Sequence, residues 1–537
     1  MSKTFTDATV SIAMAYGDRL PYDATAFAEM ARSALRQDCT DQGPLEVLIV
    51  DSRGPAASPD FLPSDLRSDR RVRHLPGQYS GRAAMYNAAI AAAKGDFLLN
   101  LYNEAAQVCL RQSAARVMLM AATRRGPVGM VYADYERIAA DGTRKDVHLL
   151  DWHEGRLRDP VDFGSAMLYS TALLREIGRL NEKYKGADLY DLRLRVSEHG
   201  GCMHIANRYA GSLYSVTAPA TAHNVFDYLL ADKSIQLEME QAATEHLQRI
   251  GAYLAPGTHV QKVEYTDADR KRLGTRVASV VIPVNNRPSF IGRAIESVQA
   301  QTVQNVEAIV VVNGGLDDPT ADAVRRYMPG GDRHKPSAPP VKLIVVDINN
   351  LGLCLNTGLA AAEGKYYVQL DSDDRLKPDA VEKLLAVYES DPTIGMVVGS
   401  YEVSTLDEAT GAITRNADVP VVTHDEWTAD NGRNNLLRIN GAGAPRSAHI
   451  KAIRDVGWFG VNDDPACRNY GEDYDLVLRM SERYTIGRVW DPIYEVIRHS
   501  GGTDHSIDQA TIDRNDNAKD HMRVEALRRR RALNGKG

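Results

Sequence analysis

The chain lacks several features that would place it in other classes of protein. Its five cysteines are odd in number and scattered over 537 residues, so they form neither a disulfide framework nor a zinc-ligand cluster. No apolar run reaches the roughly 18 residues that a membrane span needs, and the N-terminus has no apolar segment typical of a signal peptide. Acidic residues outnumber basic ones by 71 to 64, which argues against a partner bound through nucleic-acid phosphates. These absences predict a soluble, cytoplasmic protein without a nucleic-acid partner.

The composition that remains is ordinary for a globular protein, with 44% hydrophobic and 25% charged residues. At roughly 150 residues per domain, the length predicts several domains. Two short β-rich runs, Val10–Ala15 and Ser279–Val284, are each followed by a helical pattern and a second apolar run, Leu45–Asp51 and Val306–Val312. Apolar runs between helices are typical of parallel strands that are covered on both faces.

The second half of the chain repeats the first. The segment NAAIAAAKGDFLLNLYNE from Asn87 matches NTGLAAAEGKYYVQLDSD from Asn356 at a constant offset of 269 residues. Further along, LYDLRLRVSE from Leu189 matches DYDLVLRMSE from Asp473. Such self-similarity indicates duplication, so we expect two tandem α/β domains with mostly parallel sheets. The expected organisation is a first domain at 1–228, a helical linker at 229–275, a second domain at 276–508 and a charged C-terminal tail at 509–537.

The tail ends in a basic run, Arg528–Arg531. A basic helix end can contact anionic lipid, which predicts a weak membrane-surface contact. A solvated terminus is the commoner use of such a run, and both interpretations stay open at this stage.

The segment LDSDD, Leu370–Asp374, places several carboxylates at the end of an apolar strand. Like charges so close together are costly unless a cation neutralises them. Alternating Asp371 and Asp373 supply the hard oxygen ligands that Mg²⁺ or Mn²⁺ prefers. The alternative is an Asp-rich turn in which Asp373 or Asp374 caps the helix that follows Pro378.

The segment GEDYDLVLRM places an acidic pair, Glu472 and Asp473, at the start of an amphipathic helix. The helix dipole favours carboxylates there, which is a structural explanation, while a general base stabilised by that dipole is the functional one. The last apolar run, Tyr494–His499, predicts a strand that brings His499 to the same side as a further candidate ligand.

Taken together, these motifs resemble family-2 glycosyltransferases of the GT-A fold over roughly Arg276–Asp508. In order they are a strand ended by VVIPVNNR, an Asn-Gly-Gly turn, NLGLCLNTGL, LDSDD and GEDYDLVLR. Pro283 lies 88 positions before Asp371, and Asp371 lies 102 positions before Asp473. The first half resembles a divergent copy of the same family.

The resemblance implies a role for each matching residue. Asp371 and Asp373 match the pair that binds a divalent ion and the donor diphosphate, and His499 matches a histidine that completes the metal shell. Asp473 matches the catalytic base, with Glu472 beside it. Donor contacts are implied for the residues Pro283, Asn285, Asn313, Gly352, Asn356, Asp371 and Ser372.

The chain departs from the family pattern at two positions of the second copy. Val312–Asn313 stands where the family has an acidic pair that contacts the base, and Leu355 stands where an arginine often precedes the asparagine. The resemblance also assigns acceptor selection to variable loops, here 404–444 and 457–470.

The first copy keeps the pattern of strands and helices but lacks most of the candidate catalytic and metal-binding residues. Tyr102-Asn103-Glu104 stands opposite Asp371-Ser372-Asp373, which leaves a single carboxylate, and hard cations need several oxygens. Leu189 stands opposite Asp473, although a slip of one residue would offer Asp188. Asp51 remains at a strand end, so nucleotide binding stays open. We expect an inactive copy that serves packing, homodimer formation or acceptor binding.

The sequence therefore predicts an inverting, metal-dependent glycosyltransferase that uses Mn²⁺ or Mg²⁺. It would move a sugar from a nucleotide-diphosphate sugar, a UDP-sugar above all, to a hydroxyl of a carbohydrate or other acceptor. Two alternatives stay open: a two-site polysaccharide synthase that uses both copies, and a non-catalytic scaffold that binds carbohydrate or nucleotide. A two-site synthase requires a full set of carboxylates in the first copy. A non-catalytic scaffold has no need of both LDSDD and GEDYD.

Overall fold

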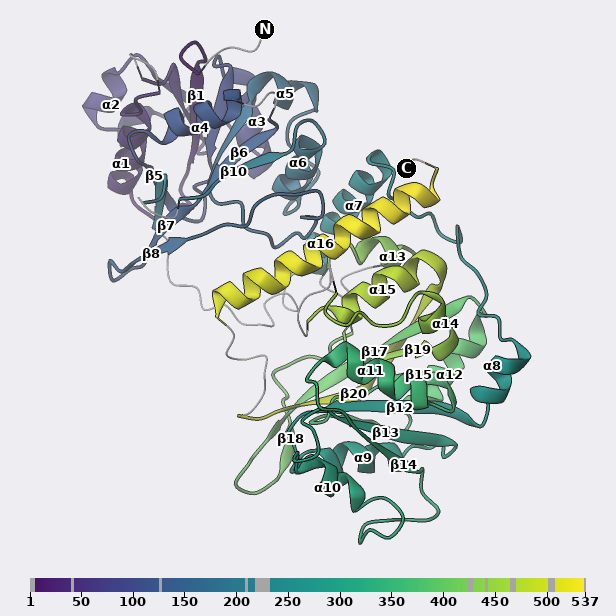
Figure 1. The fold of residues 1–537 in the computed structure, drawn as a ribbon. Helices are drawn as coiled ribbons and strands as arrows, with labels where there is room; N and C mark the ends of the chain where they lie inside the picture. The colour runs from purple at the N-terminus through teal and green to yellow at the C-terminus, as the bar shows by residue number, and fades with distance from the viewer. Residues whose placement is uncertain are drawn as a thin grey trace. The chain divides into compact units, whose positions relative to one another are not determined.

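The computed structural model describes residues 5–39, 43–124, 128–207, 211–217, 232–423, 428–439, 443–463, 470–500 and 508–535 (Figure 1). The chain divides into two compact units, Met1–Ile250 and Gly251–Gly537. Each unit is an α/β structure around a sheet whose strands are mostly parallel, as the sequence predicts. Cys467 and the predicted domain boundary at 228 lie outside the described residues.

The N-terminal unit contains a seven-stranded sheet in the order β10-β6-β9-β4-β1-β2-β3. Only β9 runs antiparallel to its neighbours. The strands are β1 Val10–Tyr16, β2 Glu46–Asp51, β3 Val72–Pro76, β4 Phe97–Leu101, β6 Met130–Ala133, β9 Ala166–Ser170 and β10 Cys202–Ile205. A small second sheet has the order β5-β11-β7-β8, with β5 Gln107–Leu110, β7 Tyr135–Ile138, β8 Arg144–Val147 and β11 Tyr214–Thr217.

Helices cover both faces of this sheet. Side chains of α1 and α4 share one apolar core with it, and those of α3, α5 and α6 share the other. The longer helices of the unit are α1 Ala24–Leu35, α3 Arg82–Ala92, α4 Ala114–Arg124, α5 Thr171–Glu176, α6 Asp188–Ser197 and α7 Lys233–Arg249. Because both faces are covered, strands such as β2 are buried along their whole length, which explains their continuous apolar sequence.

The C-terminal unit contains a nine-stranded sheet in the order β14-β13-β12-β15-β19-β17-β20-β16, with β18 paired to β17. The strands are β12 Arg276–Val284, β13 Val306–Val312, β14 Val341–Val345, β15 Gly364–Gln369, β16 Arg375–Leu376, β17 Ile394–Leu406, β18 Ile413–Arg415, β19 Arg446–His449 and β20 Thr485–Arg498. The helices used below are α9 Ile291–Gln299, α10 Thr320–Arg325, α11 Leu351–Ala361, α12 Ala380–Ser390, α14 Ile450–Asp455, α15 Glu472–Arg483 and α16 Gln509–Leu533. The predicted strand at 306–312 has the observed bounds, and the strand predicted at 279–284 begins earlier, at Arg276.

The two sheets correspond strand for strand. Read from the opposite end, the N-terminal order β3-β2-β1-β4-β9-β6-β10 matches β14-β13-β12-β15-β19-β17-β20. The strand directions match as well, because β9 and β19 are the antiparallel members at the same place in each sheet. The units thus share one topology.

A buried hydrogen-bond network recurs at the same place in both sheets. In the N-terminal unit the Ser11 hydroxyl donates to Glu46, and Glu46 also accepts from the backbone N–H of Lys94. In the C-terminal unit the Ser279 hydroxyl donates to Glu307 at 2.6 Å, and Glu307 accepts from the N–H of Glu363 at 2.8 Å. The serine in turn accepts from the next backbone N–H in each unit, at 2.9 Å. Buried polar groups need such partners, so the network fixes the same strand pairing twice.

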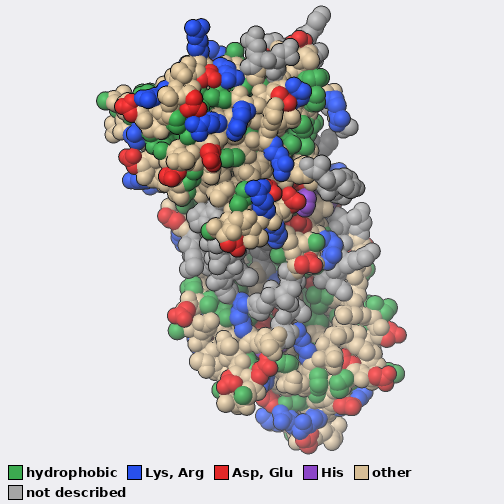
Figure 2. Space-filling view, turned by 90° about the vertical axis from the view of Figure 1, so that its left-hand side faces the viewer, with side chains coloured by type: hydrophobic (Ala, Val, Ile, Leu, Met, Phe, Trp, Pro, Cys, Tyr) green, Lys and Arg blue, Asp and Glu red, His purple; other side chains and the backbone are tan. Residues whose placement is uncertain are grey.

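The segments expected as a helical linker and a tail belong to the two compact units. Helix α7 packs on α6, and its Glu238 accepts from the backbone N–H of Lys185 at 2.8 Å. Helix α16 packs on α15 and buries Arg523 and Arg530 completely. The basic run at the end of α16 is therefore used partly for packing. Figure 2 shows Lys and Arg side chains interspersed with Asp and Glu on the visible face. Among the described residues, no helix is long and apolar enough to cross a membrane.

Candidate active site

The candidate site lies at the carboxyl ends of β12, β13 and β15 in the C-terminal unit. Ligands of open parallel sheets bind at this edge, because the loops after the strands leave room there. Asp371 follows β15 after one residue, and His499 directly follows β20. The sheet order separates β15 from β20 by β19 and β17, so chain folding brings together residues that are more than a hundred positions apart.

Asp373 lies between a histidine and an arginine. Its Oδ2 is 3.0 Å from Nε2 of His499, and it forms an ion pair with Arg287 from the loop after β12. The His499 side chain is only 2% exposed, and the ring of Phe290 lies over it at a centroid distance of 4.3 Å. The imidazole is therefore held with one nitrogen toward the carboxylate.

Asp371 lies close to the same group. Burial raises its pKa above the ordinary value, the charge of Asp373 raises it further, and Arg446 opposes both. Its backbone N–H donates to the Tyr494 hydroxyl at 3.1 Å. A carboxylate that is disfavoured by burial and by a like charge gains from a cation nearby.

Asp374 has a structural role. Its two oxygens accept from the Tyr494 hydroxyl at 2.9 Å and from the N–H of Ile497 at 2.8 Å. Neither Asp373 nor Asp374 caps a helix, because α12 begins at Ala380 after Asp379. The capping alternative raised by the sequence is therefore wrong.

Asp473 lies in the first turn of α15 and faces a basic side chain. Its Oδ2 is 3.0 Å from Nη1 of Arg446, which projects from β19. Burial by itself would raise the pKa of Asp473, but the charges of Arg446 and Lys519 hold it below its ordinary value. The carboxylate is therefore ionised at neutral pH and able to accept a proton.

Glu472 has the opposite environment. It is 7% exposed, and its Oε2 is buried with no hydrogen-bond partner among the described residues. Burial, followed by the neighbouring charge of Asp473, raises its pKa to about 7. The acidic pair thus contains one carboxylate stabilised in its charged form and one that is easily protonated.

Arg446, Arg287 and Lys519 are site residues that the sequence analysis missed. Arg446 acts on both Asp473 and Asp371, so it joins the two acidic motifs. Lys519 comes from α16, where its ammonium group lies 4.7 Å from the ring centre of Tyr470. Arg446 begins the short strand β19, whose sequence RSAH has no apolar pattern, so neither it nor Lys519 is linked to Asp473 by a signal in the local sequence.

The residues assigned to the donor are arranged less uniformly. Asn313 donates from Nδ2 to Asn349 and to Cys354, and its Oδ1 is buried without a partner among the described residues. Asn285 is exposed, Pro283 is the penultimate residue of β12, and Ser372 is buried. Asn313 therefore keeps an acceptor available at this edge of the sheet.

Gly352 and Asn356 serve a loop that packs on α11. A Cβ at Gly352 would lie 1.8 Å from the carbonyl oxygen of Gly460, so only glycine allows this approach. The Asn356 amide donates to the Phe459 carbonyl at 2.9 Å and accepts from the Phe459 N–H at 3.0 Å. Both contacts position the loop, and donor contacts for these two residues stay a prediction.

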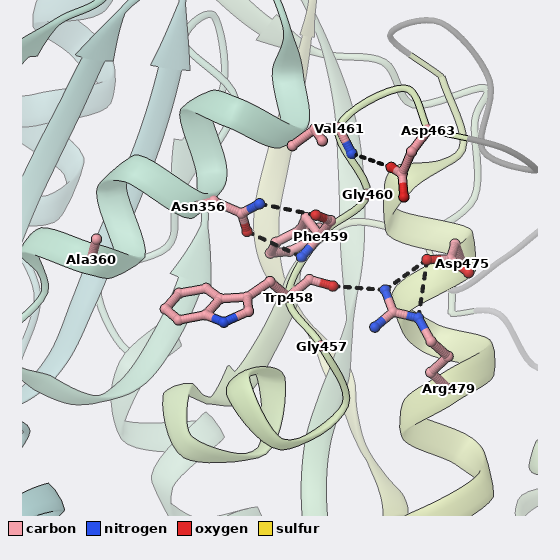
Figure 3. Close-up of a pocket in the computed structure, with 10 residues that line it drawn as sticks. All are labelled: Asn356, Ala360, Gly457, Trp458, Phe459, Gly460, Val461, Asp463, Asp475 and Arg479. Carbon is pink, nitrogen blue, oxygen red and sulfur yellow. Dashed lines mark hydrogen bonds and ion pairs between the residues drawn. The ribbon is translucent and has the colours of Figure 1, made fainter.

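That loop also borders a cavity of about 610 Å³ between α11 and α15. Figure 3 shows Trp458 on the α11 side and Asp475 with Arg479 on the α15 side. Arg479 pairs with Asp475 at 2.6 Å and donates to the Trp458 carbonyl at 2.7 Å. Neither Asp371 nor Asp473 lines this cavity, so it is separate from the acidic cluster.

The corresponding edge of the N-terminal unit has different side chains at the positions of the acidic residues. The Arg195–Asp191 pair repeats the Arg479–Asp475 pair, and Arg195 also donates to the carbonyl of Arg179, as Arg479 does to Trp458. This register places Leu189 opposite Asp473. Asp188 is buried and paired with Arg82.

The asparagine of the Tyr-Asn-Glu segment is used for packing. Asn103 accepts from the backbone N–H of Ala15 at 2.9 Å and donates to its carbonyl at 2.7 Å. Beside it, burial raises the pKa of Glu104 above its ordinary value. The N-terminal unit therefore has an apolar residue at the position of Asp473 and a single carboxylate opposite the pair Asp371 and Asp373.

Two curated relatives resemble part of the chain. The chondroitin synthase of Escherichia coli is 24% identical over 264 residues, which cover 49% of this chain and 34% of the relative. The hyaluronan synthase of Pasteurella multocida is 31% identical over 207 residues, which cover 38% of this chain and 19% of the relative. The chain thus spans about a third or less of the length of these relatives.

Solved structures show only distant likeness. Staphylococcus aureus TarS 1-349 in complex with UDP-GlcNAc is 17% identical with a TM-score of 0.33, and the match covers 48% of this chain and 73% of that one. The mannosyltransferase PcManGT from Pyrobaculum calidifontis, in complex with GDP-Man and Mn²⁺, is 14% identical with a TM-score of 0.31, covering 56% and 84%.

A family comparison matches part of the C-terminal unit, including one of its two acidic motifs. The family described as Glycosyl transferase family 2 matches residues 279–454, which include Arg287, Asp371, Asp373 and Arg446. Asp473 and His499 lie beyond the matched segment. The C-terminal unit therefore contains a segment, residues 279–454, that matches glycosyl transferase family 2.

Proposed function

We propose that the C-terminal unit is an inverting, metal-dependent glycosyltransferase. It takes a sugar from a nucleotide-diphosphate sugar, most simply a UDP-sugar, and transfers it to a hydroxyl of a carbohydrate or other acceptor. The observation that carries the proposal is the pairing of two acidic motifs through Arg446 within a family-2 domain. A binding scaffold has no use for an ionised carboxylate held beside a second carboxyl group of raised pKa.

A divalent ion is part of the proposal. The donor set of two carboxylates and an imidazole, from Asp371, Asp373 and His499, suits Mn²⁺ or Mg²⁺. Within the described ranges no group of three such side chains is already arranged around a metal position, and Arg287 pairs with Asp373. Metal binding by these residues therefore requires Arg287 to give up that contact. A bound ion would stabilise the negative charge of the departing diphosphate.

Asp473 is the proposed base. In its ionised form it accepts the proton of the acceptor hydroxyl at a carboxylate oxygen, while that hydroxyl oxygen forms a bond to the anomeric carbon and the bond to the diphosphate breaks. Attack from the face opposite the leaving group inverts the configuration and needs no covalent sugar–enzyme intermediate. Glu472 is the second candidate, because a pKa of about 7 also suits a general base at neutral pH.

We further infer that the N-terminal unit is an inactive copy of the same domain. The shared strand order and the repeated Ser–Glu network support a common origin. The leucine at 189 and the Asp188–Arg82 ion pair support the loss of transfer chemistry. A cytoplasmic location, a homodimer and a weak membrane contact of the basic tail stay predictions.

The test is a screen of nucleotide sugars against the full chain. Thermal shift and donor hydrolysis are measured for UDP-, GDP- and other nucleotide sugars, each with and without Mn²⁺. We expect one nucleotide class to raise the melting temperature and to be hydrolysed slowly in the presence of the ion. If no nucleotide sugar does either, the transferase assignment is wrong and the scaffold alternative gains.

A further inference from the structure

A second cavity adjoins the acidic cluster on the far side of the His499 ring. It has a volume of about 340 Å³ and lies between the first turn of α9, the end of β17 and the end of β20. Phe290 lines it and also lies over the His499 imidazole, whose Nε2 faces Asp373. The His499 side chain thus lies between a molecule in this cavity and Asp373, one of the proposed metal ligands.

Arg293 gives the cavity an unusual polar group. Its Nη1 is buried and has no hydrogen-bond partner, and among the described residues no carboxylate forms an ion pair with it. The other arginines of the site differ, because Arg287 pairs with Asp373 and Arg446 with Asp473. Buried donors are nearly always satisfied, and a guanidinium left without an acceptor is costly. Because Nη1 itself is closed to solvent, an oxygen acceptor that arrives in the cavity would meet the rest of this half-buried side chain.

The other walls limit what that ligand can be. Ser289 adds an exposed hydroxyl, while Leu406 and the Phe290 ring add apolar surface. Glu408 also lines the cavity, but its Oε1 accepts from both the backbone N–H and the hydroxyl of Ser500. These two donors hold Glu408 in its charged form and turn one carboxylate oxygen toward Ser500, while the exposed position lets solvent screen that charge. The cavity therefore offers a planar cation beside a ring face and a hydroxyl, which suits a sugar that carries an anionic group.

We propose that this cavity binds the acidic group of the acceptor, a carboxylate or a phosphate on a sugar, through the Arg293 guanidinium. The inference rests on the proposed function, since it specifies the class of acceptor for the same site. The guanidinium presents parallel N–H groups that match two oxygens of a carboxylate or phosphate. A neutral sugar offers single hydroxyl oxygens and gains less from this geometry.

The test measures ligand binding to the full chain in the absence of any donor. The probes are methyl β-D-glucuronide against methyl β-D-glucoside, and glucose 6-phosphate against glucose, followed by calorimetry or by ligand-observed NMR. We expect the acidic member of at least one pair to bind about tenfold more tightly than its neutral partner. The pair that shows the preference identifies the anionic group as carboxylate or phosphate.

The variants R293M and E408Q move the preference in opposite directions. R293M should abolish it, R293K should reduce it because the charge remains without the planar fork, and E408Q should increase it by removing an opposing charge. R325M is the matched control, because Arg325 is an exposed arginine on α10 whose ion pair among the described residues is with Asp322. A wild-type protein with no preference for the acidic probes, or an R293M protein that keeps the preference, would overturn the proposal. The E408Q result remains informative if R293M does not fold. The transferase assignment is tested by a different measurement, donor hydrolysis, so its failure can be distinguished from failure of this proposal.

Discussion

Asp473 is the residue on which the proposed chemistry depends most directly. Because Arg446 and Lys519 keep it ionised, replacing its carboxylate by an amide removes the proton acceptor together with the charge that faces these two cations. We expect Asp473→Asn to lower the transfer rate by about 10²–10⁴-fold while the affinity for the donor changes little. Steady-state kinetics and a melting curve on the same preparation measure the two effects. Asp322→Asn, on the exposed face of α10, is the control for loss of a surface carboxylate.

A structural N-terminal carboxylate would behave differently. Its loss would cost about 0.3–1 kcal/mol of stability and little activity. A folded Asp473→Asn protein with near-normal turnover would therefore transfer the role of base to Glu472.

Glu472 makes stability depend on pH in an unusual direction for a carboxyl group. Its folded pKa of about 7 lies above the ordinary value of 4.5, so between these values the folded state binds more protons than the unfolded state. Stability from this group is therefore full below pH 4.5 and is lost as the pH rises toward 7. The loss is on the order of 3 kcal/mol at most.

We expect Glu472→Gln to remove this pH dependence. Urea unfolding at intervals from pH 5 to pH 8 should show the free energy of unfolding falling with pH in the wild type and changing less in the variant. Parallel curves for the two proteins would show that the Glu472 carboxyl group titrates near its ordinary pKa.

The metal assignment is tested at Asp373, where a cation must replace Arg287. Excess chelator should abolish transfer, and Mn²⁺ or Mg²⁺ should restore it. Asp373→Ala should weaken nucleotide binding far more in the presence of the ion than in its absence, as calorimetry with UDP would show. Asp379→Ala, at the start of α12 with Lys383 as its partner, is the control. Full activity in excess chelator contradicts the assignment for Asp371, Asp373 and His499 together.

At the scale of elements, the same amide clamp joins a helix to a loop in both units. Asn87 and Leu180 repeat the two backbone hydrogen bonds of Asn356 and Phe459. We expect Asn87→Leu and Asn356→Leu each to lower the free energy of unfolding by about 1–3 kcal/mol, because each leaves buried backbone groups without partners. Hydrogen exchange at Leu180 and Phe459 would locate the effect.

Asn87→Asp and Asn356→Asp are the matched variants, since they keep the acceptor and lose the donor. Asn356→Asp should be affected less than Asn356→Leu, whereas Asn87→Asp also brings a carboxylate against Glu182, a second acceptor of the Asn87 amide. A large loss at one position and none at the other would contradict an equivalent role of the clamp in the two units.

At the scale of the whole molecule, the two units should contribute unequally to transfer. Glu104 is the one carboxylate opposite the pair Asp371 and Asp373, and its Oε1 is buried without a partner among the described residues. We expect Glu104→Gln to leave the transfer rate within a few-fold, since the proposal gives this unit no catalytic step. The matched change in the other unit, Asp373→Asn, should reduce the rate strongly. Loss of one of two sugar-adding activities in Glu104→Gln would revive the two-site synthase.

The sequence predicts the α/β sheet, and places the acidic motifs at its edge, for a physical reason. β-Branched apolar runs between helical patterns, such as Val306–Val312 with its single glutamate, favour buried strands, and the carboxyl ends of parallel strands meet at one edge. That logic brings Asp371 and His499 to the same edge before any coordinates are known. It cannot supply Arg446, because a single arginine in a short strand carries no periodic signal. Nor does local pattern separate a glycine that contacts a ligand from Gly352, which admits a neighbouring carbonyl oxygen.

The position of Lys519 has a consequence for the order in which the site matures during synthesis. It lies on α16, the last described helix, and supplies part of the charge around Asp473. The ribosome must therefore release α16 before that carboxylate has its final electrostatic surroundings. Until then Arg446 and the backbone hydrogen bonds of the helix oppose the effect of burial without Lys519, and Asp473 holds a proton more readily. A nascent chain can thus complete every strand of the sheet while the pKa of its candidate base, Asp473, is still higher than in the finished protein.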